Sequence, residues 1–307
     1  MKKHFLEVIR RAACQLPEDV LEAITRGRDA EPPGSATRSA LDDVLVNCGI
    51  ARESSRPLCQ DTGTHIWYVF HPQELAQAAL TRDILWATRE ATRRSYLRPN
   101  AVDSITGQNS GDNTGIGAPV VHFHQWRSKK IHADLLLKGG GSENVSTQLS
   151  LPNAAIKAGR DLEGVRRAVI EAIFLAQGKG CGPGIIGVGV GGDRATSMVE
   201  AKEQLFRRLD DRNPDETLAA LESRLVKECN ELGIGPMGFG GATTVLGMKI
   251  GKRHRLPACF FVSVAYLCWA GRRASVTVSG GRAVFPAVTE IGSHYVLPEE
   301  LNRRVKR

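Results

Sequence analysis

The sequence predicts an α+β protein, or an irregular α/β one, with a mixed sheet, flanking helices and an N-terminal helical region at about residues 1–56. Two observations carry this prediction. Helical periodicity fills the N-terminal region, and strand-like segments then appear between helices without regular alternation. The chain has 307 residues, 42% hydrophobic and 24% charged, which is ordinary for a globular protein. We expect one domain over residues 1–307, because no linker or repeat divides the sequence.

The expected helices are marked by apolar residues at intervals of three or four. In the N-terminal region they occupy residues 6–13, 17–24 and 39–46, with a Pro- and Gly-containing loop at 31–35. Further helices are expected at 74–96, 162–177, 193–209 and 215–232. Gly233, directly after the last of these, is a natural helix stop.

Strands are expected where short apolar or alternating segments stand between turn-forming residues. These segments cover residues 65–72, 119–126, 131–137, 185–190, 257–267 and 275–278. The segment 100–117 is rich in Asn, Gly, Ser and Thr, and we expect it to be a loop.

One expected strand runs into a glycine pattern at 187–192 that formally matches the dinucleotide-binding motif Gly-x-Gly-x-x-Gly. Such a site also needs a second strand that ends in an acidic residue about 20 residues further on. Asp210 and Asp211 lie near that distance, but a charged helix and a Pro-containing loop surround them. We therefore reject a dinucleotide site here.

Two cellular settings are excluded by the sequence. No run of about 18 apolar residues is present, so no membrane-spanning segment is expected. The basic N-terminus is interrupted by Glu7, Arg10 and Arg11 before the apolar core of a signal peptide could form. We therefore expect a cytoplasmic protein.

The charge is basic, with 41 Lys and Arg against 33 Asp and Glu, a formal net charge of +8. The basic pairs are dispersed along the chain, and for most of them we expect a solvated surface. The alternative is an electropositive site for an anion. Aromatic residues are only 6% and do not interleave with the basic pairs, so we expect no nucleic-acid partner and favour a small acid.

The seven cysteines are scattered and contain no Cys-x-x-Cys pair. Four of them fall in, beside or at the start of expected helices or strands and are predicted to be inert core thiols: Cys14, Cys48, Cys229 and Cys259. The other three lie in loops of Gly, Pro and polar residues: Cys59, Cys181 and Cys268.

Three loop cysteines could bind a metal as thiolates. Structural zinc sites usually bring ligands in pairs two to four residues apart, and that spacing is missing. A cubane iron–sulfur cluster held by three widely spaced cysteines fits better, although spacing alone is a weak signal. Such a cluster leaves one iron without a cysteine, and an open iron is a Lewis acid that can bind a substrate oxygen.

Several motifs in fixed order carry a family resemblance. The Cys-Gln-Asp-Thr-Gly segment at 59–63 resembles the signature of class I (iron–sulfur) fumarases and the related L-tartrate dehydratases. The same family is indicated by segments at 113–119, 138–144 and 232–238, and the Cys-Trp-Ala-x-Arg-Arg segment at 268–273 resembles the third cysteine motif of its two-subunit members. The resemblance extends from about residue 10 to about residue 280.

This resemblance implies a [4Fe-4S] hydro-lyase whose cluster ligands are Cys59, Cys181 and Cys268, with one iron not ligated by cysteine. Relatives commonly have Cys-Pro-Pro where this chain has Cys181-Gly182-Pro183; the glycine loosens the loop but removes no ligand. We expect the same three ligands here.

The resemblance also implies roles for residues around the cluster. Asp61 matches the catalytic aspartate, which does acid–base work. Gln60 and Arg98 match substrate-binding residues, and Gly139 and Gly140 match a loop that lines the cavity.

From the residues alone, two of these positions have a structural alternative. Asp61 is typical of an Asx-turn, and Arg98 of a surface salt bridge. The glycine loop at 138–142 could form an anion-binding nest, although its spacing fits neither a P-loop nor a Rossmann motif. The loop at 233–241 is expected to be structural, with no chemistry assigned.

The function that follows from the resemblance is reversible hydration of fumarate, a small dicarboxylate, to (S)-malate. The chain ends roughly where the α portion ends in two-subunit relatives, so we expect an α subunit in a hetero-oligomer whose active site a separate β subunit completes. One alternative is an L-tartrate dehydratase α subunit, which converts tartrate to oxaloacetate. An alternative of another class is a non-catalytic, zinc-stabilised basic binding protein.

Overall fold

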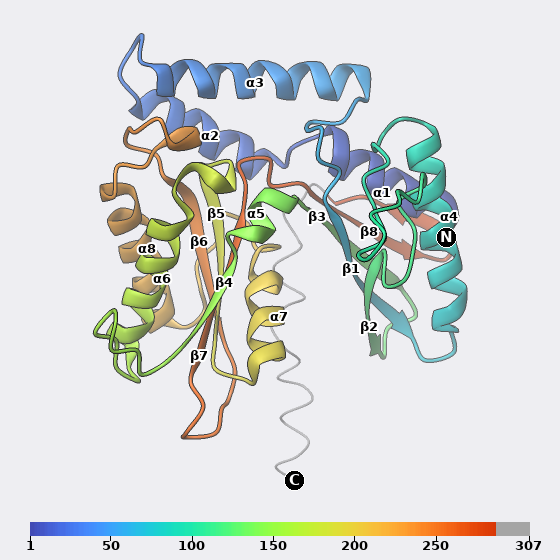
Figure 1. Ribbon diagram of the computed structural model, residues 1–307. Helices are drawn as coiled ribbons and strands as arrows, with labels where there is room; N and C mark the ends of the chain where they lie inside the picture. Colours follow the sequence, from blue (N-terminus) through green and yellow to red (C-terminus); the bar gives the residue numbers. More distant parts are fainter. Residues whose placement is uncertain (287–307) are drawn as a thin grey trace.

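The computed structural model describes residues 1–286 of the chain, and these form two mixed sheets set side by side with helices around them (Figure 1). Each sheet contains both parallel and antiparallel strand pairs. The mixed architecture expected from the sequence is therefore present, but as two sheets and not as one. Within residues 1–286, no helix combines the length and apolar character needed to cross a lipid bilayer.

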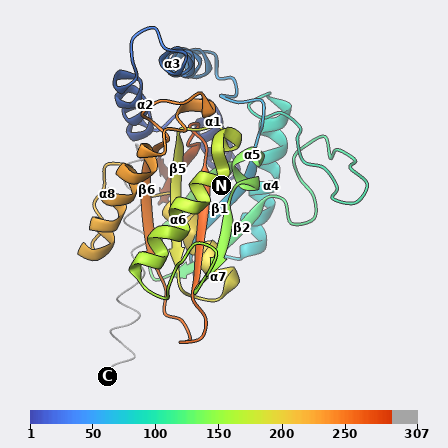
Figure 2. The same ribbon diagram turned by 60° about the vertical axis from the view of Figure 1, so that its left-hand side comes forward.

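The N-terminal region is helical, as expected, and consists of α1 (Lys2–Cys14), α2 (Glu18–Ala30) and α3 (Ala36–Ser54). The third helix begins at the capping residue Ser35, whose hydroxyl accepts a hydrogen bond from the backbone N–H of Arg38. It runs to Ser54, well beyond the predicted end at residue 46. Helices α2 and α3 lie across the upper end of the molecule in both ribbon views (Figures 1 and 2).

The first sheet has five strands in the spatial order β2 (Val120–Trp126), β1 (Thr64–Pro72), β3 (Ile131–Lys138), β8 (Arg273–Ser279) and β9 (Arg282–Val284). Helices α1 and α4 (Gln77–Arg93) cover one face, where Phe5 and Ile84 pack with Trp67 and Leu135 in a buried apolar cluster. Between α4 and β2 the chain forms a long loop that projects from the body of the molecule (Figure 2).

The second sheet has four strands in the spatial order β4 (Thr147–Ser150), β7 (Phe261–Leu267), β5 (Gly184–Val190) and β6 (Val245–Lys252). Two helices pack in the apolar core on one face, α6 (Leu162–Ala176) and α8 (Glu216–Glu231), and α7 (Arg194–Gln204) packs on the other. Strand β6 was missed from the sequence because Gly247 and Gly251 interrupt its apolar pattern.

The glycines of β5 allow α7 to approach the sheet closely. A Cβ atom on Gly187 would lie 2.0 Å from the carbonyl oxygen of Ala201, and one on Gly189 would lie 2.1 Å from that of Ser197. The Gly-x-Gly pattern at 187–192 is thus used for helix–strand packing, which supports its rejection as a dinucleotide site.

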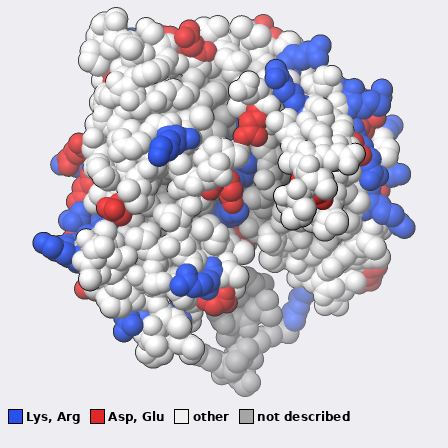
Figure 3. Space-filling model, in the orientation of Figure 1, with Lys and Arg blue, Asp and Glu red and all other residues white. Residues whose placement is uncertain are grey.

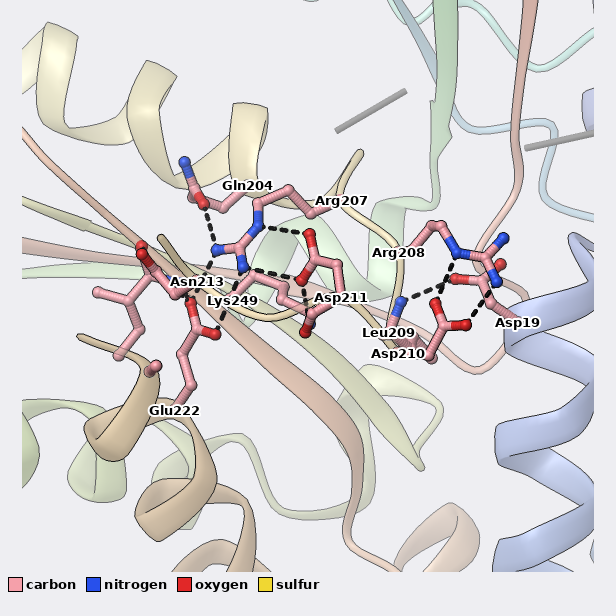
Figure 4. A network of polar contacts seen from close by, with 12 residues as sticks. Asp19, Gln204, Arg207, Arg208, Leu209, Asp210, Asp211, Asn213, Glu222 and Lys249 are labelled. Carbon is pink, nitrogen blue, oxygen red and sulfur yellow. Dashed lines mark hydrogen bonds and ion pairs between the residues drawn. The ribbon is translucent and has the colours of Figure 1, made fainter. Parts of the chain in front are cut away.

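A buried ionic cluster lies between α7, α8 and β6 (Figure 4). We call it the Arg207 cluster; its members are Gln204, Arg207, Asp211, Asn213, Glu222 and Lys249. Arg207 donates to Glu222 at 2.8 Å and to both carboxylate oxygens of Asp211 at 2.8 and 2.9 Å.

The two sheets are joined by a crossover at residues 268–272, which carries the chain from β7 in the second sheet to β8 in the first. At its end, the carbonyl of Arg272 accepts a hydrogen bond from the backbone N–H of Leu137 in β3 at 2.9 Å. The crossover therefore lies at the junction of the two sheets.

Candidate active site

The three loop cysteines come together from different parts of the fold. Cys59 precedes β1 of the first sheet, Cys181 precedes β5 of the second, and Cys268 begins the crossover between them. The backbone N–H of Trp269 donates to the carbonyl of Cys181 at 3.2 Å. Partial desolvation raises the pKa of the Cys181 thiol and full burial raises that of the Cys268 thiol, and the neighbouring Cys59 raises both further. The three thiols therefore lie close enough to interact electrostatically.

The Cys181 loop is shaped by the ring of Tyr266. A Cβ atom on Gly180 or on Gly184 would lie 2.5 Å from this ring, so only glycine fits at either position. Cys181 itself adopts a left-handed backbone conformation with φ of 54°, which is uncommon for a residue with a side chain. This tight turn leaves the Cys181 side chain exposed.

The glycine loop at 233–241, predicted to be structural, supports the Cys181 loop. The backbone N–H of Met237 donates to the carbonyl of Gly182 at 3.1 Å, and a Cβ atom on Gly178 would lie 2.6 Å from the carbonyl oxygen of Met237. These contacts hold the Cys181 loop against the loop at 233–241.

The four remaining cysteines were all expected in the core. Cys14, Cys48 and Cys229 are buried, and burial raises the pKa of their thiols to about 11, 11 and 12. Cys259 differs from the expectation. It is only partly buried, because β7 begins at Phe261 and Cys259 lies in the preceding turn.

Asp61 connects two of the sequence motifs. Its Oδ1 atom accepts from the backbone N–H of Gly63 at 2.9 Å, which is the Asx-turn considered from the sequence. Its Oδ2 atom accepts from the backbone N–H of Gly140 at 2.6 Å. Residues 140–144 form a short helix, α5 (Gly140–Asn144), in place of an open loop. The N–H of Gly140 thus binds the carboxylate of Asp61.

An open cavity of about 550 Å³ adjoins Asp61 and is lined by Gln60, Asp61, Arg98, Pro99 and Asn100. Its lining therefore brings together Gln60, Asp61 and Arg98, which are separated by up to 38 residues in the sequence. Arg98 is exposed and forms none of the ion pairs found among residues 1–286, in contrast to the surface salt bridge considered for it.

Two residues with no role assigned from the sequence hold Arg98 in place. The hydroxyl of Thr62 donates to the carbonyl of Arg98 at 2.7 Å and accepts from its backbone N–H at 2.9 Å. The side chain of Asn113 donates to the same carbonyl at 2.8 Å and accepts from the backbone N–H groups of Asn100 and Ala101. Thr62 and Asn113 belong to the quoted motifs at 59–63 and 113–119, which were the available signal.

The basic pairs are less uniformly exposed than expected. On the face shown in Figure 3, Lys and Arg side chains are interspersed with Asp and Glu side chains. The pair at 93–94 is exposed, and both arginines bind Glu90 at 2.7 Å. Arg207, Arg272 and Arg273 are buried, which corrects the expectation of a solvated surface for their pairs. Composition cannot distinguish a buried arginine from an exposed one.

Lys138 is a second buried cation near the cysteines. Its ammonium group lies 3.0 Å from a carboxylate oxygen of Glu143 and 3.3 Å from the hydroxyls of Ser142 and Ser146. Burial lowers the pKa of Lys138, and the opposite charge of Glu143 partly offsets this effect. Lys202 of α7 also binds Glu143, at 2.6 Å, so this acid joins α5 to the second sheet's helices.

Among residues 1–286, no three His, Cys, Asp or Glu side chains form a group that could hold a single metal ion. A cubane cluster makes a different demand, because each cysteine binds a separate iron atom. Two observations fit such a group: three neighbouring thiols on three loops, and the buried Nε of Arg272, which has no hydrogen-bond partner among the described residues. An anionic cluster beside Cys268 would balance the positive charge of Arg272.

The comparison with known protein families agrees with these motifs. The family model described as "Fumarate hydratase (Fumerase)" matches residues 2–277. The chain belongs to the fumarate hydratase family. The members of this family are hydro-lyase enzymes, so the non-catalytic, zinc-stabilised binding protein considered from the sequence is set aside.

Individual relatives within the fumarate hydratase family carry two kinds of name. A Geobacillus stearothermophilus protein, provisionally named fumarate hydratase class I, is 47% identical over 275 residues, which are 89% of this chain and 54% of that protein. A Methanocaldococcus jannaschii protein, provisionally named L(+)-tartrate dehydratase subunit alpha, is 34% identical over 88% of this chain and 94% of its own length. The Escherichia coli K12 L(+)-tartrate dehydratase subunit alpha is 31% identical over 86% of each chain. This chain therefore spans about half of the first relative and most of the other two.

Proposed function

We propose that the chain is the α subunit of a [4Fe-4S]-dependent hydro-lyase that reversibly hydrates fumarate to (S)-malate in the cytoplasm. The observation that carries this proposal is the meeting of Cys59, Cys181 and Cys268 at the junction of the two sheets, next to the cavity lined by Asp61. When bound by these three cysteines, the cluster supplies a Lewis-acidic iron for a substrate oxygen.

The chain's own residues divide the remaining work. Hydration forms one C–O and one C–H bond across the double bond, so a proton must move at carbon while the dicarboxylate is held still. Arg98 presents a planar fork that suits a carboxylate, and Gln60 adds a polar contact beside it. Asp61 is the acid–base residue, and its hydrogen bonds from Gly63 and Gly140 fix the carboxylate in one orientation.

Gly139 lies close to this carboxylate. A Cβ atom there would lie 3.2 Å from Oδ2 of Asp61, which is tighter than most side-chain contacts, and at an ordinary contact distance of 3.5 Å from a terminal nitrogen of Arg272. The absence of a side chain lets the α5 N-terminus approach Asp61. Gly139 and Gly140 do not line the cavity themselves but lie beside Asp61, which does.

We further propose that a separate β subunit completes the site, giving a hetero-oligomer. Two relatives that this chain covers over 94% and 86% of their length are named subunit alpha. The substrate carries two carboxylates, whereas Arg98 is the one cationic residue that lines the cavity among residues 1–286. A partner is expected to supply the second carboxylate-binding group.

Two outcomes remain for the substrate. Fumarate and malate are favoured by the higher identity to the relative named fumarate hydratase, 47% against 34% and 31%. L-tartrate is the second candidate, because the relatives named for it match over nearly their whole length.

The proposal is tested by anaerobic reconstitution with iron and sulfide, followed by assay with the β partner. We expect about four iron and four sulfide per chain, and turnover of malate that needs the partner. Metal without sulfide would overturn the cluster, and full turnover by this chain alone would overturn the β subunit. A higher kcat/KM for L-tartrate than for malate would assign the second substrate.

A further inference from the structure

Two adjacent arginines at the end of the crossover have opposite surroundings. In β8, Ala274 and Val276 face the core shared with α1, so the alternation of the strand places Arg273 on the opposite face, whereas Arg272 precedes the strand. Both side chains are buried. Arg273 forms an ion pair with Asp19 of α2. Arg272 forms none of the ion pairs found among the described residues.

The guanidinium of Arg272 lies between two parts of the proposed site. Its Nη1 atom donates to the backbone carbonyl of Asp61 at 2.5 Å, and its Nη2 atom lies 3.5 Å from the position that a Cβ on Gly139 would take. Its Nε atom is buried and has no hydrogen-bond partner within residues 1–286. One edge of this cation is thus used, and its Nε donor is left for a group that residues 1–286 do not supply.

An unanswered buried cation is costly, since its desolvation is not repaid by an opposite charge. His65 lies near Arg272 but cannot repay it, because an imidazole ring is neutral or cationic and never carries the negative charge that is required. Cys268 lies on the same crossover as Arg272, and both side chains are buried. An anionic group held at Cys268 is therefore the partner that would balance Arg272.

We propose that Arg272 is a positioning residue of the hydro-lyase: it holds Asp61 through the backbone carbonyl and supplies positive charge at the Cys268 corner of the cluster. This inference rests on the proposed function. Lys138, the other buried cation near Cys268, is paired with Glu143, so Arg272 alone of the two has its charge free for the cluster.

The test compares Arg272→Met and Arg272→Lys with the wild-type chain, each reconstituted anaerobically with iron and sulfide and assembled with the β partner. The readouts are iron and sulfide content, the rate at which a chelator removes the iron, the midpoint potential of the cluster, and kcat and KM separately. The neighbouring Arg273→Met is the matched control, because its side chain is equally buried but faces Asp19. Circular dichroism checks the fold of each variant.

For Arg272→Met we expect iron loss to be about 10- to 100-fold faster and the potential to become more negative, because a positive charge that favours the reduced cluster is removed. Arg272→Lys should keep the potential close to wild type but lower kcat, since an ammonium cannot both hold the Asp61 carbonyl and face Cys268. Arg273→Met should lower thermal stability and leave the potential of the folded fraction unchanged.

The results separate the two proposals. A wild-type chain that binds no iron and sulfide overturns both. A wild-type chain with a cluster, together with an Arg272→Met variant of unchanged iron loss and potential, overturns the role of Arg272 alone. An Arg272→Met chain that does not fold leaves Arg272→Lys to decide, and unchanged kcat in that variant contradicts the proposed hold on Asp61.

Discussion

Two buried charged regions of this molecule differ in how fully their polar atoms are hydrogen-bonded. In the Arg207 cluster, every buried side-chain nitrogen and oxygen has a hydrogen-bond partner within residues 1–286 (Figure 4). Around Asp61, by contrast, Arg272 and His65 keep buried nitrogens without partners in the same part of the chain. The first region is complete within the described residues, and the second leaves donors that these residues do not use.

This difference distinguishes buried charges that stabilise the fold, in the Arg207 cluster, from buried charges proposed to act in catalysis, around Asp61. A fully satisfied polar network fixes the elements that it joins and has nothing left to bind. A partly satisfied one carries a desolvation cost and leaves donors or acceptors that a ligand can use. The predictions below test whether the two regions do divide in this way.

The largest effect is expected from the cysteines. Changing Cys59, Cys181 or Cys268 to Ser should abolish the absorbance near roughly 400 nm of the reconstituted cluster, because each removes the thiolate of one iron. Cys48→Ala and Cys229→Ala are the controls, since both thiols are buried in apolar clusters. Full absorbance in all three Ser variants would contradict the ligand assignment.

Asp61→Asn should lower kcat by about 10²- to 10⁴-fold while the cluster absorbance is retained, because the acid–base group is lost and the shape is kept. Asp112→Asn is a matched control. Asp112 also forms an Asx-turn, with the N–H of Thr114 at 2.9 Å, but does not line the cavity. Steady-state assay of the assembled enzyme measures both, and a kcat for Asp61→Asn within threefold of wild type would remove Asp61 from the mechanism.

In the Arg207 cluster, Arg207→Met should lower the free energy of unfolding by about 3–5 kcal/mol, because the buried carboxylate of Glu222 would lose its charged partner. Arg212→Met, which breaks an exposed pair with Glu216, should cost less than about 1 kcal/mol. Urea unfolding measures both values. The absorbance of the iron–sulfur cluster per folded chain should not change. Loss of that absorbance in Arg207→Met would mean that the Arg207 cluster and the candidate site are not independent.

The smallest effect concerns acid sensitivity near the site. The pKa of His65 is about 4 in the folded chain and 6.5 as a free group, so the unfolded state binds the proton first as pH falls. Stability from the neutral ring is present above pH 6.5 and is lost as pH falls toward 4, about 2 kcal/mol between pH 7.5 and pH 5. Urea unfolding at both pH values should show a weaker pH dependence for His65→Gln than for the exposed control His254→Gln. Equal dependence would show that His65 titrates normally.

Much of this fold was predictable because local patterns govern it. The N-terminal helices and strands such as β1 and β5 follow apolar periodicity that needs no tertiary information. Strand β6 was not predictable, because its glycines make room for residues that are distant in the sequence. A Cβ on Gly251, for example, would lie 1.9 Å from the carboxylate of Glu200. The division of the strands into two sheets likewise depends on long-range pairing.

The candidate site was predictable as a set of residues and not as a geometry. The motifs named Cys59, Asp61 and Arg98, but the bond that joins their loops runs from Thr62 across 36 residues. Arg272 was grouped with surface basic pairs, since burial of a charged side chain leaves no mark in composition. Only the fold shows that, within residues 1–286, its charge lacks a carboxylate partner.

The crossover at 268–272 has a consequence beyond catalysis. A cluster held by Cys59, Cys181 and Cys268 would tie the first sheet, the second sheet and the strip of chain between them into one cross-link. Without it, the seam between the sheets rests on noncovalent contacts, among them the apolar cluster in which Ile66 and Leu136 of the first sheet pack with Ile185 and Leu267 of the second. Chains without the cluster are then expected to be degraded faster by cellular proteases, so the supply of iron would affect the lifetime of the protein.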